Sequence, residues 1–367
     1  SSTLAWAAIM LFSRFWGTVS DLLVGRKNVI LTAAVGSTGM TLLLAFSGSI
    51  PTVLIGRFLI EAFGSGLAPA ALALLSGRGG AARRGRRMSL FVTSQAIGLF
   101  AGSILGGLLS TVVAFRYGFL IVTAVSSLAA LSAYFVPAET RDAHALDIGW
   151  RSVLRKTFPS FRAVRNDGDT SAYGVINLYL GIVLRKAGIV GIYGLLMVFL
   201  QEERSLTPLI SGSISAINPA VQALSMPLWG RAADRLSRKR VFLTGYTLTL
   251  LVPLMLLLSS SFWLLMAAFA LLGLGFAGFI TGATSWIGDV APEEREGELM
   301  GLIKVSQGLG GIAGPAVAGV VSSPAVGGYD GMFVAMTALL VTGLVVTAAG
   351  TRESLPARRR RAETSSR

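Results

Sequence analysis

The sequence of 367 residues contains no cysteine and a single histidine, and only 14% of its residues are charged. The lack of cysteine excludes disulfides, thiolate nucleophiles and Fe–S clusters, and His144 alone cannot form a His-rich metal site. Soluble proteins carry about 25% charged residues, so this composition does not fit a water-soluble enzyme. The sequence also has no Walker motif and no Gly-x-Gly-x-x-Gly that follows a strand. ATP-driven and redox chemistry are therefore unsupported, and we predict no cofactor.

Apolar residues, in contrast, make up 53% of the chain. A helix needs about 20 apolar residues to cross the hydrocarbon core of a membrane, and eleven stretches reach that scale. Their apolar residues run continuously and do not alternate, which favours helices over the strands of a β-barrel. The predicted spans are 3–20, 29–46, 52–76, 88–113, 118–136, 173–200, 207–228, 241–258, 262–285, 299–322 and 331–349.

Positive charge is distributed unevenly over the loops between these spans. The loops that we assign to the inner side hold 25 of the 32 Lys and Arg residues, whereas the outer loops hold only Arg116 and Arg204. Because Lys and Arg collect in cytoplasmic loops, this imbalance predicts a multi-pass plasma-membrane protein with a cytoplasmic C-terminus. Topology and lipid contact explain the net charge of +14 without nucleic acid. The inner segments are 21–28, 77–87, 137–172, 229–240, 286–298 and the tail from Thr351.

The chain contains an internal repeat. Segment 16–27 recurs as 229–239 at an offset of 213, and segment 94–107 recurs as 306–319 at an offset of 212. Two matches at nearly one offset indicate a duplicated unit of about six helices. Both copies have the same orientation, so the halves are predicted to be parallel repeats related by an axis along the membrane normal.

The repeat sets the predicted domain boundaries. They define an N-terminal bundle at 1–136, a cytoplasmic linker at 137–172, a C-terminal six-helix bundle at 173–350 and a basic cytoplasmic tail at 351–367. The linker suits either an amphipathic helix on the inner membrane surface or a solvated connector. The counterpart of the sixth span would precede residue 1. We therefore expect an intact protein with twelve spans, of which the first is missing here.

Two six-helix halves that each carry a Gly-x-x-x-Asp loop followed by basic residues resemble the major facilitator superfamily over essentially the whole chain. In the second-half loop Ser237 replaces a glycine of the family signature, and in the first-half loop Leu22 follows Asp21 where the family has a basic residue. Segment 289–297 is similar to the family's link between its tenth and eleventh helices. The resemblance implies an all-α membrane protein built from two six-helix bundles, with eleven of twelve helices present.

We assign conformational gating to the loops that carry the resemblance. Asp21 and Asp234 lie at the inner ends of helices, where arginines of neighbouring helices or loops can pair with them. Such pairs would hold the halves together on the inside and break when the protein opens inward, so their strength would set the equilibrium between the states. The basic residues could instead only enforce topology. The proposed gating residues are Gly17, Asp21, Arg26, Lys27, Gly230, Asp234, Arg235, Arg238, Lys239, Asp289 and Arg295.

Two ionisable residues stand one helical turn apart in the third span. A charged side chain within a span costs at least about 2.5–3.5 kcal/mol unless it is paired or hydrated. Glu61 is the only acid that we place well inside a span, and Arg57 precedes it by four residues. Arg57 matches the arginine that antiporters of the family carry in their fourth helix, which is linked there to proton transfer. We predict proton coupling through this pair, and a static buried ion pair is the alternative.

Further polar residues within the spans are candidates for a substrate cavity. Arg185 and Lys186 lie near the middle of the sixth span. Either that helix begins later and both side chains extend to the inner surface, or they face a cavity and bind an anionic group. Gln95 and Gln307, at equivalent positions of the repeat, would line the cavity or join helices by hydrogen bonds. The proposed cavity residues are Gln95, Arg185, Asn218, Gln222 and Gln307.

Glycines at four-residue spacing let two helices approach closely or bend. In the family, a Gly-x-x-x-Gly-Pro-x-x-Gly-Gly run in the fifth helix marks drug/proton antiporters. Here Ser103 replaces that proline in the first-half run, so we expect mainly a packing role. Trp286, at the inner edge of its span, is expected to be an interfacial anchor. The proposed packing residues are Gly98, Gly102, Gly106, Gly310, Gly314 and Pro315.

The favoured function is a monomeric secondary transporter that moves a small molecule by alternating access, with its site near the midplane between the halves. Proton-coupled export of an amphiphilic compound is our first interpretation. Uptake of a sugar or an organic anion, by symport or facilitated diffusion, is the alternative within transport. A membrane-embedded enzyme would need a catalytic constellation that one linker histidine cannot supply. A truncated, transport-inactive protein or sensor remains a third class.

Overall fold

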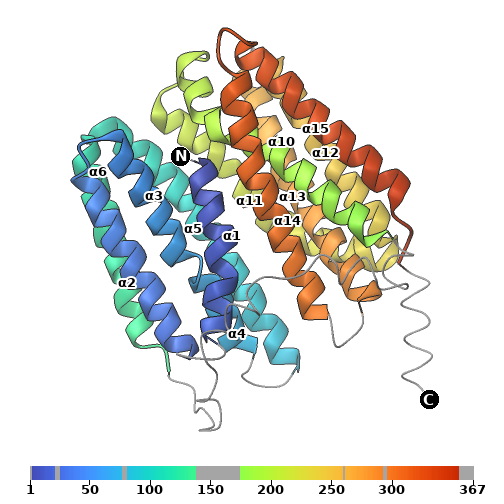
Figure 1. The fold of residues 1–367 in the computed structure, drawn as a ribbon, viewed down its shortest axis with the longest axis horizontal. Helices are drawn as coiled ribbons and strands as arrows, with labels where there is room; N and C mark the ends of the chain where they lie inside the picture. Colours follow the sequence, from blue (N-terminus) through green and yellow to red (C-terminus); the bar gives the residue numbers. More distant parts are fainter. Residues whose placement is uncertain are drawn as a thin grey trace. The chain divides into compact units, whose positions relative to one another are not determined.

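The computed structural model describes residues 2–20, 25–76, 81–137, 174–258, 261–291 and 296–354. Throughout these residues the regular secondary structure is helical, which confirms the predicted all-α architecture (Figure 1). Each predicted span lies largely within one helix, except that 52–76 is divided between two. Three helices also extend five to seven residues into the predicted inner loops 77–87, 229–240 and 286–298. The helices are α1 (Ser2–Val19), α2 (Arg26–Ala45), α3 (Ile50–Gly64), α4 (Leu67–Ser76), α5 (Ala81–Val112), α6 (Phe115–Tyr134), α10 (Val175–Glu202), α11 (Pro208–Arg235), α12 (Arg238–Leu257), α13 (Phe262–Val290), α14 (Glu296–Val321) and α15 (Gly328–Gly350).

Eight spans of the described chain are long and apolar enough to cross a membrane, with α3 and α4 counted together. The helices α1, α11 and α14 fall outside this group. For α11 the reason is visible in its sequence, which places four serines, Asn218 and Gln222 along the helix. Polar residues within a membrane helix face a bundle interior or water, because lipid cannot satisfy them.

The helix pair α3 and α4 replaces one predicted span because the backbone is interrupted between Gly64 and Leu67. The amide of Ser65 still donates to the carbonyl of Glu61 at 2.9 Å, so α3 closes normally. Pro69 has no amide hydrogen and cannot extend the same bonding pattern back to Ser65. Glu61 therefore lies in the last turn of α3, directly before the break.

The described residues form two compact units. One takes in the described parts of Ser1–Gln95 and Leu108–Pro159, and the other takes in those of Ala96–Gly107 and Ser160–Arg367. The predicted linker lies outside the described residues apart from Pro137. The middle of α5 groups with the second unit because Gly107 approaches α11 closely. A Cβ on Gly107 would lie 3.2 Å from the Cα of Gly212.

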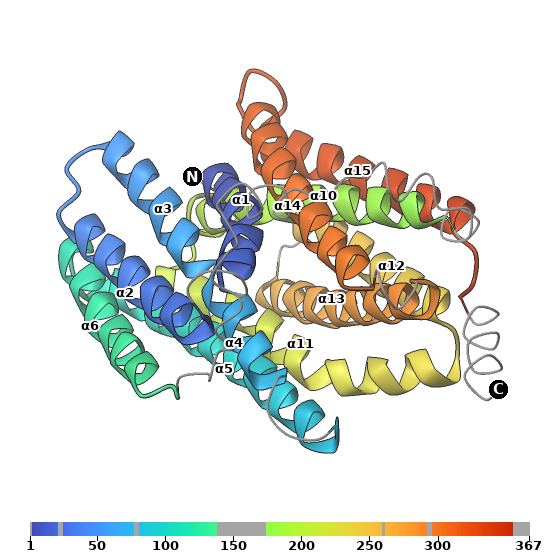
Figure 2. The ribbon, with the colours of Figure 1, turned by 60° about the horizontal axis from the view of Figure 1, so that its bottom comes forward.

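In the first unit α2 packs against α3 and α6, and α1 packs against α3 and α4. Figure 1 shows α2 and α6 side by side. In the second unit α13 lies between α11 and α12, and α10 packs against α14 and α15 (Figure 2). The second core contains large aromatic side chains that are almost fully buried, namely Phe242, Tyr246, Phe269, Phe279, Trp286 and Phe333.

The internal repeat is visible in equivalent contacts of the two units. The indole of Trp16 donates to the carbonyl of Ala62 at 2.7 Å. The indole of Trp229, its counterpart, donates to the carbonyl of Leu274 at 3.0 Å. Each indole also lies where a glycine leaves room, because a Cβ on Gly66 would be 2.7 Å from the Trp16 ring and a Cβ on Gly278 would be 2.8 Å from that of Trp229. The same glycine-dependent contact therefore recurs in both halves.

The predicted packing glycines differ between the halves. A Cβ on Gly310 would lie 2.9 Å from the amide nitrogen of Ala187, and a Cβ on Gly314 would lie 2.8 Å from its carbonyl carbon. The backbones of α14 and α10 are thus in direct contact. In α5, a Cβ on Gly98, Gly102 or Gly106 would meet nothing within 4 Å among the described residues. Close approach in α5 occurs at Gly107 instead.

We expect Gly314→Ala to destabilise the second unit, because the added methyl group overlaps the backbone of α10. Overpacking of this kind costs about 1–3 kcal/mol. The matched control is Gly319→Ala in the same helix, where a Cβ meets nothing within 4 Å. Thermal unfolding of the purified protein in detergent should show a lower midpoint for Gly314→Ala only. Equal midpoints for the two variants would contradict the close packing of α10 and α14.

Candidate functional site

The turn between α11 and α12 folds Arg238 back under the end of α11. The helix α11 ends at Arg235 and α12 begins at Arg238, where the hydroxyl of Ser237 caps the new helix by accepting from the amide of Arg240 at 3.0 Å. The guanidinium of Arg238 donates to the carbonyl of Ala233 at 2.5 Å. Arg238 is only 3% exposed. A charge buried this deeply needs partners.

Two carboxylates supply the counter-charge, and they are not equivalent. The Nε of Arg238 lies 2.8 Å from Oδ2 of Asp289, whose side chain is 13% exposed. Its Nη2 lies 3.3 Å from Oδ1 of Asp234, whose side chain is 72% exposed. Solvent screens the exposed pair, which contributes about 0–1 kcal/mol. The buried pair between Arg238 and Asp289 is therefore the stronger link, and it joins α12 to the end of α13.

The segment that follows α15 completes this cluster. The hydroxyl of Ser354 donates to Asp289 Oδ2 at 3.0 Å, and the hydroxyl of Ser237 donates to the carboxylate of Glu353. The ammonium of Lys239 donates to the carbonyl of Thr351 at 2.5 Å. We call the cluster of Asp234, Ser237, Arg238, Lys239, Asp289 and segment 351–354 the Arg238 network.

The sequence pattern does not predict the part of the Arg238 network that follows α15. Residues 351–354 were included in a basic tail, yet Ser354 is fully buried and Thr351 is 4% exposed. Trp286, which we expected at the membrane interface, is 1% exposed and donates to the carbonyl of Arg352 at 3.0 Å. That expectation was wrong because the segment after α15 folds over the indole. Nothing in the local sequence pattern signals such docking.

The remaining predicted gating residues are more dispersed. In the first unit, Arg26 donates to the carbonyl of Ala73 at 3.0 Å, and the ammonium of Lys27 lies 5.5 Å from the ring centroid of Tyr134 at the end of α6. In the second unit, the ammonium of Lys239 likewise contacts the end of the last helix, where it donates to the carbonyl of Ala348 at 2.8 Å. The residues Gly17, Gly230 and Arg235 lie at helix ends, where a Cβ on either glycine meets nothing within 4 Å and Arg235 is exposed. Asp21 and Arg295 lie outside the described residues.

Arg57 and Glu61 share one face of α3. They interact electrostatically, but among the described residues no ion pair of 4.0 Å or less joins them. Arg57 is exposed on the surface of its unit and Glu61 is half-buried. Glu61 is the only acidic residue among the described residues up to position 137. Its carboxylate is thus close enough to interact with the charge of Arg57 and can still accept another partner.

Arg185 does not extend to the inner surface. It is 1% exposed, and its Nη2 donates to the hydroxyl of Thr249 at 2.7 Å. Its guanidinium lies over the ring of Phe279, 4.0 Å from the centroid. Because α10 begins at Val175 and Arg185 is buried, the arrangement in which the helix starts later and this side chain extends to the surface is wrong. A role in binding an anionic group stays a prediction.

The predicted cavity amides are divided between the units' surfaces and cores. Asn218 donates to the hydroxyl of Tyr193 at 2.7 Å, which joins α11 to α10. Gln222 is half-buried one turn further along α11, and Gln307 is 6% exposed in α14. Gln95 is exposed. Asn218 and Gln307 each retain a buried polar atom that makes no hydrogen bond to the described residues.

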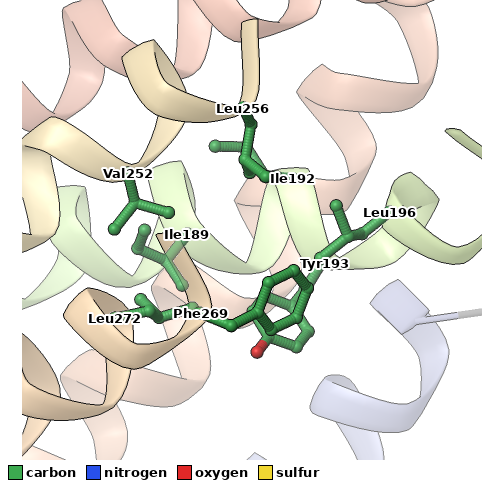
Figure 3. A pocket seen from close by; sticks show the side chains of 8 residues that line it. All are labelled: Ile189, Ile192, Tyr193, Leu196, Val252, Leu256, Phe269 and Leu272. Carbon is green, nitrogen blue, oxygen red and sulfur yellow. The ribbon is translucent and has the colours of Figure 1, made fainter. Parts of the chain in front are cut away.

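An apolar cavity lies beside Tyr193 in the second unit (Figure 3). Its free volume of about 10 Å³ leaves room for about one water molecule. The hydroxyl of Tyr193 is the only polar side-chain group among the eight lining residues. This cavity is therefore a packing defect and not a substrate site. The lining residues are Ile189, Ile192, Tyr193, Leu196, Val252, Leu256, Phe269 and Leu272.

Comparison with known proteins agrees with this geometry. The sequence profile of the Major Facilitator Superfamily matches residues 1–212 and 178–366. The chain is 25% identical to the multidrug resistance protein MdtG of Proteus mirabilis over 87% of this chain and 78% of that protein. It is also 25% identical to the uncharacterized MFS-type transporter YuxJ of Bacillus subtilis, over 85% of this chain and 78% of that protein.

Solved structures share the fold at lower identity. The human organic anion transporter MFSD10 superposes with a TM-score of 0.68 at 17% identity, over 94% of this chain and 83% of that one. A variant of the nucleoside transporter NupG superposes with a TM-score of 0.75 at 13% identity, over 96% and 90% of the two chains. The repeated contacts in the two helical units and the matching profile lead to one conclusion. The chain belongs to the major facilitator superfamily, whose members are membrane transporters and not enzymes.

Proposed function

We propose that this transporter couples export of a small amphiphilic compound to proton entry, with Glu61 as the proton-carrying group. The observation that carries the proposal is the position of Glu61. It is a half-buried acid in a membrane helix and lies directly before the break between α3 and α4. It interacts electrostatically with Arg57, but within the described part of the chain the two side chains do not form an ion pair of 4.0 Å or less. A carboxylate held in this way can exchange a proton when its surroundings change.

Similarity to a relative named as a multidrug resistance protein supports export over uptake. Facilitated diffusion, or symport of a sugar or organic anion, is the alternative. The direction of the pH gradient that drives accumulation separates antiport from symport, and facilitated diffusion gives no accumulation under either gradient.

Glu61→Gln mimics the protonated carboxyl group, so we expect it to abolish accumulation driven by a pH gradient while exchange of substrate between the two sides continues. The measurement is uptake into liposomes of a panel of labelled amphiphilic compounds of either charge. Glu202→Gln, at the exposed outer end of α10, is the control and should keep full gradient-driven transport. Full gradient-driven transport by Glu61→Gln would remove the coupling role. A purely structural pair would instead show a lower melting temperature for Glu61→Gln, restored when leucine replaces both Arg57 and Glu61.

We further propose that the Arg238 network holds the inner end of the second unit closed in one state of the transport cycle and opens in the other. Its strength would then bias the equilibrium between the states. Because Asp289 is much less exposed than Asp234, loss of its charge should have the larger effect. Breaking a buried ion pair costs about 3–5 kcal/mol.

The opening can be measured through a single introduced cysteine, because the chain has none of its own. Ala233 is 1% exposed beneath Arg238, so Ala233→Cys should react slowly with a water-soluble maleimide. Asp289→Asn in this background should raise the labelling rate about tenfold or more, and Asp234→Asn should raise it less, since 1.4 kcal/mol corresponds to about a factor of 10. Asp330→Asn, at the start of α15, is the control. An unchanged rate in Asp289→Asn would contradict the gating role.

A further inference from the structure

Three basic side chains lie well within the helices of the second unit. Arg185 and Lys186 lie 10 and 11 residues after the start of α10, and Lys304 lies 8 residues after the start of α14. At 1.5 Å per residue, these positions are about 12–16 Å along their helices. Lys186 is close enough to both Arg185 and Lys304 to experience their charges. We call these three residues the cation cluster.

The contact between α10 and α14 brings the cluster together. A Cβ on Gly310 would lie 2.8 Å from the Cβ of Lys186, so the backbone of α14 passes directly beside that lysine. Lys304 lies under two turns before Gly310 on the same helix. The glycines that we first assigned to packing therefore also hold two ammonium groups near each other. Repulsion between like charges makes that arrangement costly unless something compensates it.

Acidic side chains do not supply the compensation from within the helices. In the described part of the second unit, every acidic residue lies at or beyond a helix end. At the inner side these are Asp234, Asp289, Glu296, Glu298 and Glu353, and at the outer side they are Glu202, Glu203 and Asp330. The middle of this unit thus carries three positive charges and no negative one among the described residues.

Neutral groups hold the cluster in place. Arg185 is fixed by Thr249 and by the ring of Phe279. The ring of Phe276 lies 5.5 Å from the guanidinium of Arg185 and 6.0 Å from the ammonium of Lys186. Cation–aromatic contacts of this kind contribute about 0.5–2 kcal/mol, and neither ring carries a negative charge.

Unused donors point to a ligand. The buried Nε of Arg185 has no hydrogen-bond partner among the described residues. Gln307, one turn after Lys304, is 6% exposed and its side-chain Nε2 is likewise unpartnered there. Buried donors without partners are rare in native structures. Lys304, in contrast, is exposed on the surface of its unit, so an incoming group can reach the cluster.

We propose that the cation cluster binds the anionic group of the transported compound, a carboxylate, sulfonate or phosphate attached to an apolar body. Lys186 and Lys304 contact the anion, and Nε of Arg185 and Nε2 of Gln307, which lack a partner among the described residues, donate to it. The ring of Phe276 packs against the apolar body beside the anion. The proposal rests on the proposed transport function in one respect only, namely that the bound anion is the transported compound. An anionic lipid headgroup has the same chemistry and is the other source to be distinguished.

The test compares two probes that differ in charge but share a ring system, 2-naphthalenesulfonate and the neutral 2-naphthalenesulfonamide. Their binding to the purified intact chain in phosphatidylcholine nanodiscs is measured by calorimetry. We expect the sulfonate to bind about tenfold more tightly or better. Lys186→Gln and Lys304→Gln should each weaken sulfonate binding about tenfold and leave sulfonamide binding unchanged, and Lys304→Arg should retain it. Arg231→Gln, an exposed cation at the inner end of α11, is the matched control.

Equal affinity for the two probes, no sulfonate binding, or full sulfonate binding by Lys304→Gln would each overturn the site. Competition from phosphatidylglycerol in the nanodiscs would assign the cluster to lipid and overturn the cargo assignment. The outcome is separable from that of the proposed function. Charge-selective binding without gradient-driven transport would contradict proton-coupled export but support the anion site. If a pH gradient drives transport of the sulfonamide as fast as that of the sulfonate, export is supported and the anion site is contradicted.

Discussion

The buried charge of Arg238 is the constraint on which one end of the second unit, where α11 meets α12, depends. A guanidinium that is 3% exposed must be paired, because an uncompensated buried charge costs several kcal/mol. Asp289 provides the close counter-charge and Ala233 provides a carbonyl oxygen. Satisfying this one group brings the ends of α11, α12 and α13 together. Ser354 then bonds the same carboxylate, so the segment after α15 joins them.

The two units follow the same plan but balance charge differently. Both use an indole packed on a glycine, Trp16 in one and Trp229 in the other. Both direct a lysine towards the end of their last helix, Lys27 from the start of α2 and Lys239 from the start of α12. The first unit has a single acid among its described residues, Glu61, whereas the middle of the second unit has only cations. Duplication thus explains the scaffold, and divergence at charged positions explains the proposed coupling and recognition sites.

Sequence alone predicted the helices and the repeat, because apolar length and a fixed offset are properties of the chain itself. The break before Pro69 follows from a local rule, yet the uniform hydrophobicity of 52–76 concealed it. The burial of Arg185 was left open, because the arrangement depends on Thr249 and Phe279 from other helices. Docking of Ser354 was missed for the same reason. Contacts between segments far apart in sequence carry no periodic signal.

The ranking of the two carboxylates around Arg238 is tested most directly by double-mutant cycles. The free energy of unfolding is measured in detergent for Arg238→Gln, Asp289→Asn and the double variant, and a second cycle replaces Asp289→Asn with Asp234→Asn. The account predicts a coupling of about 1–3 kcal/mol between Arg238 and Asp289, and less than about 0.5 kcal/mol between Arg238 and Asp234. Additive effects for Arg238 and Asp289 would contradict it.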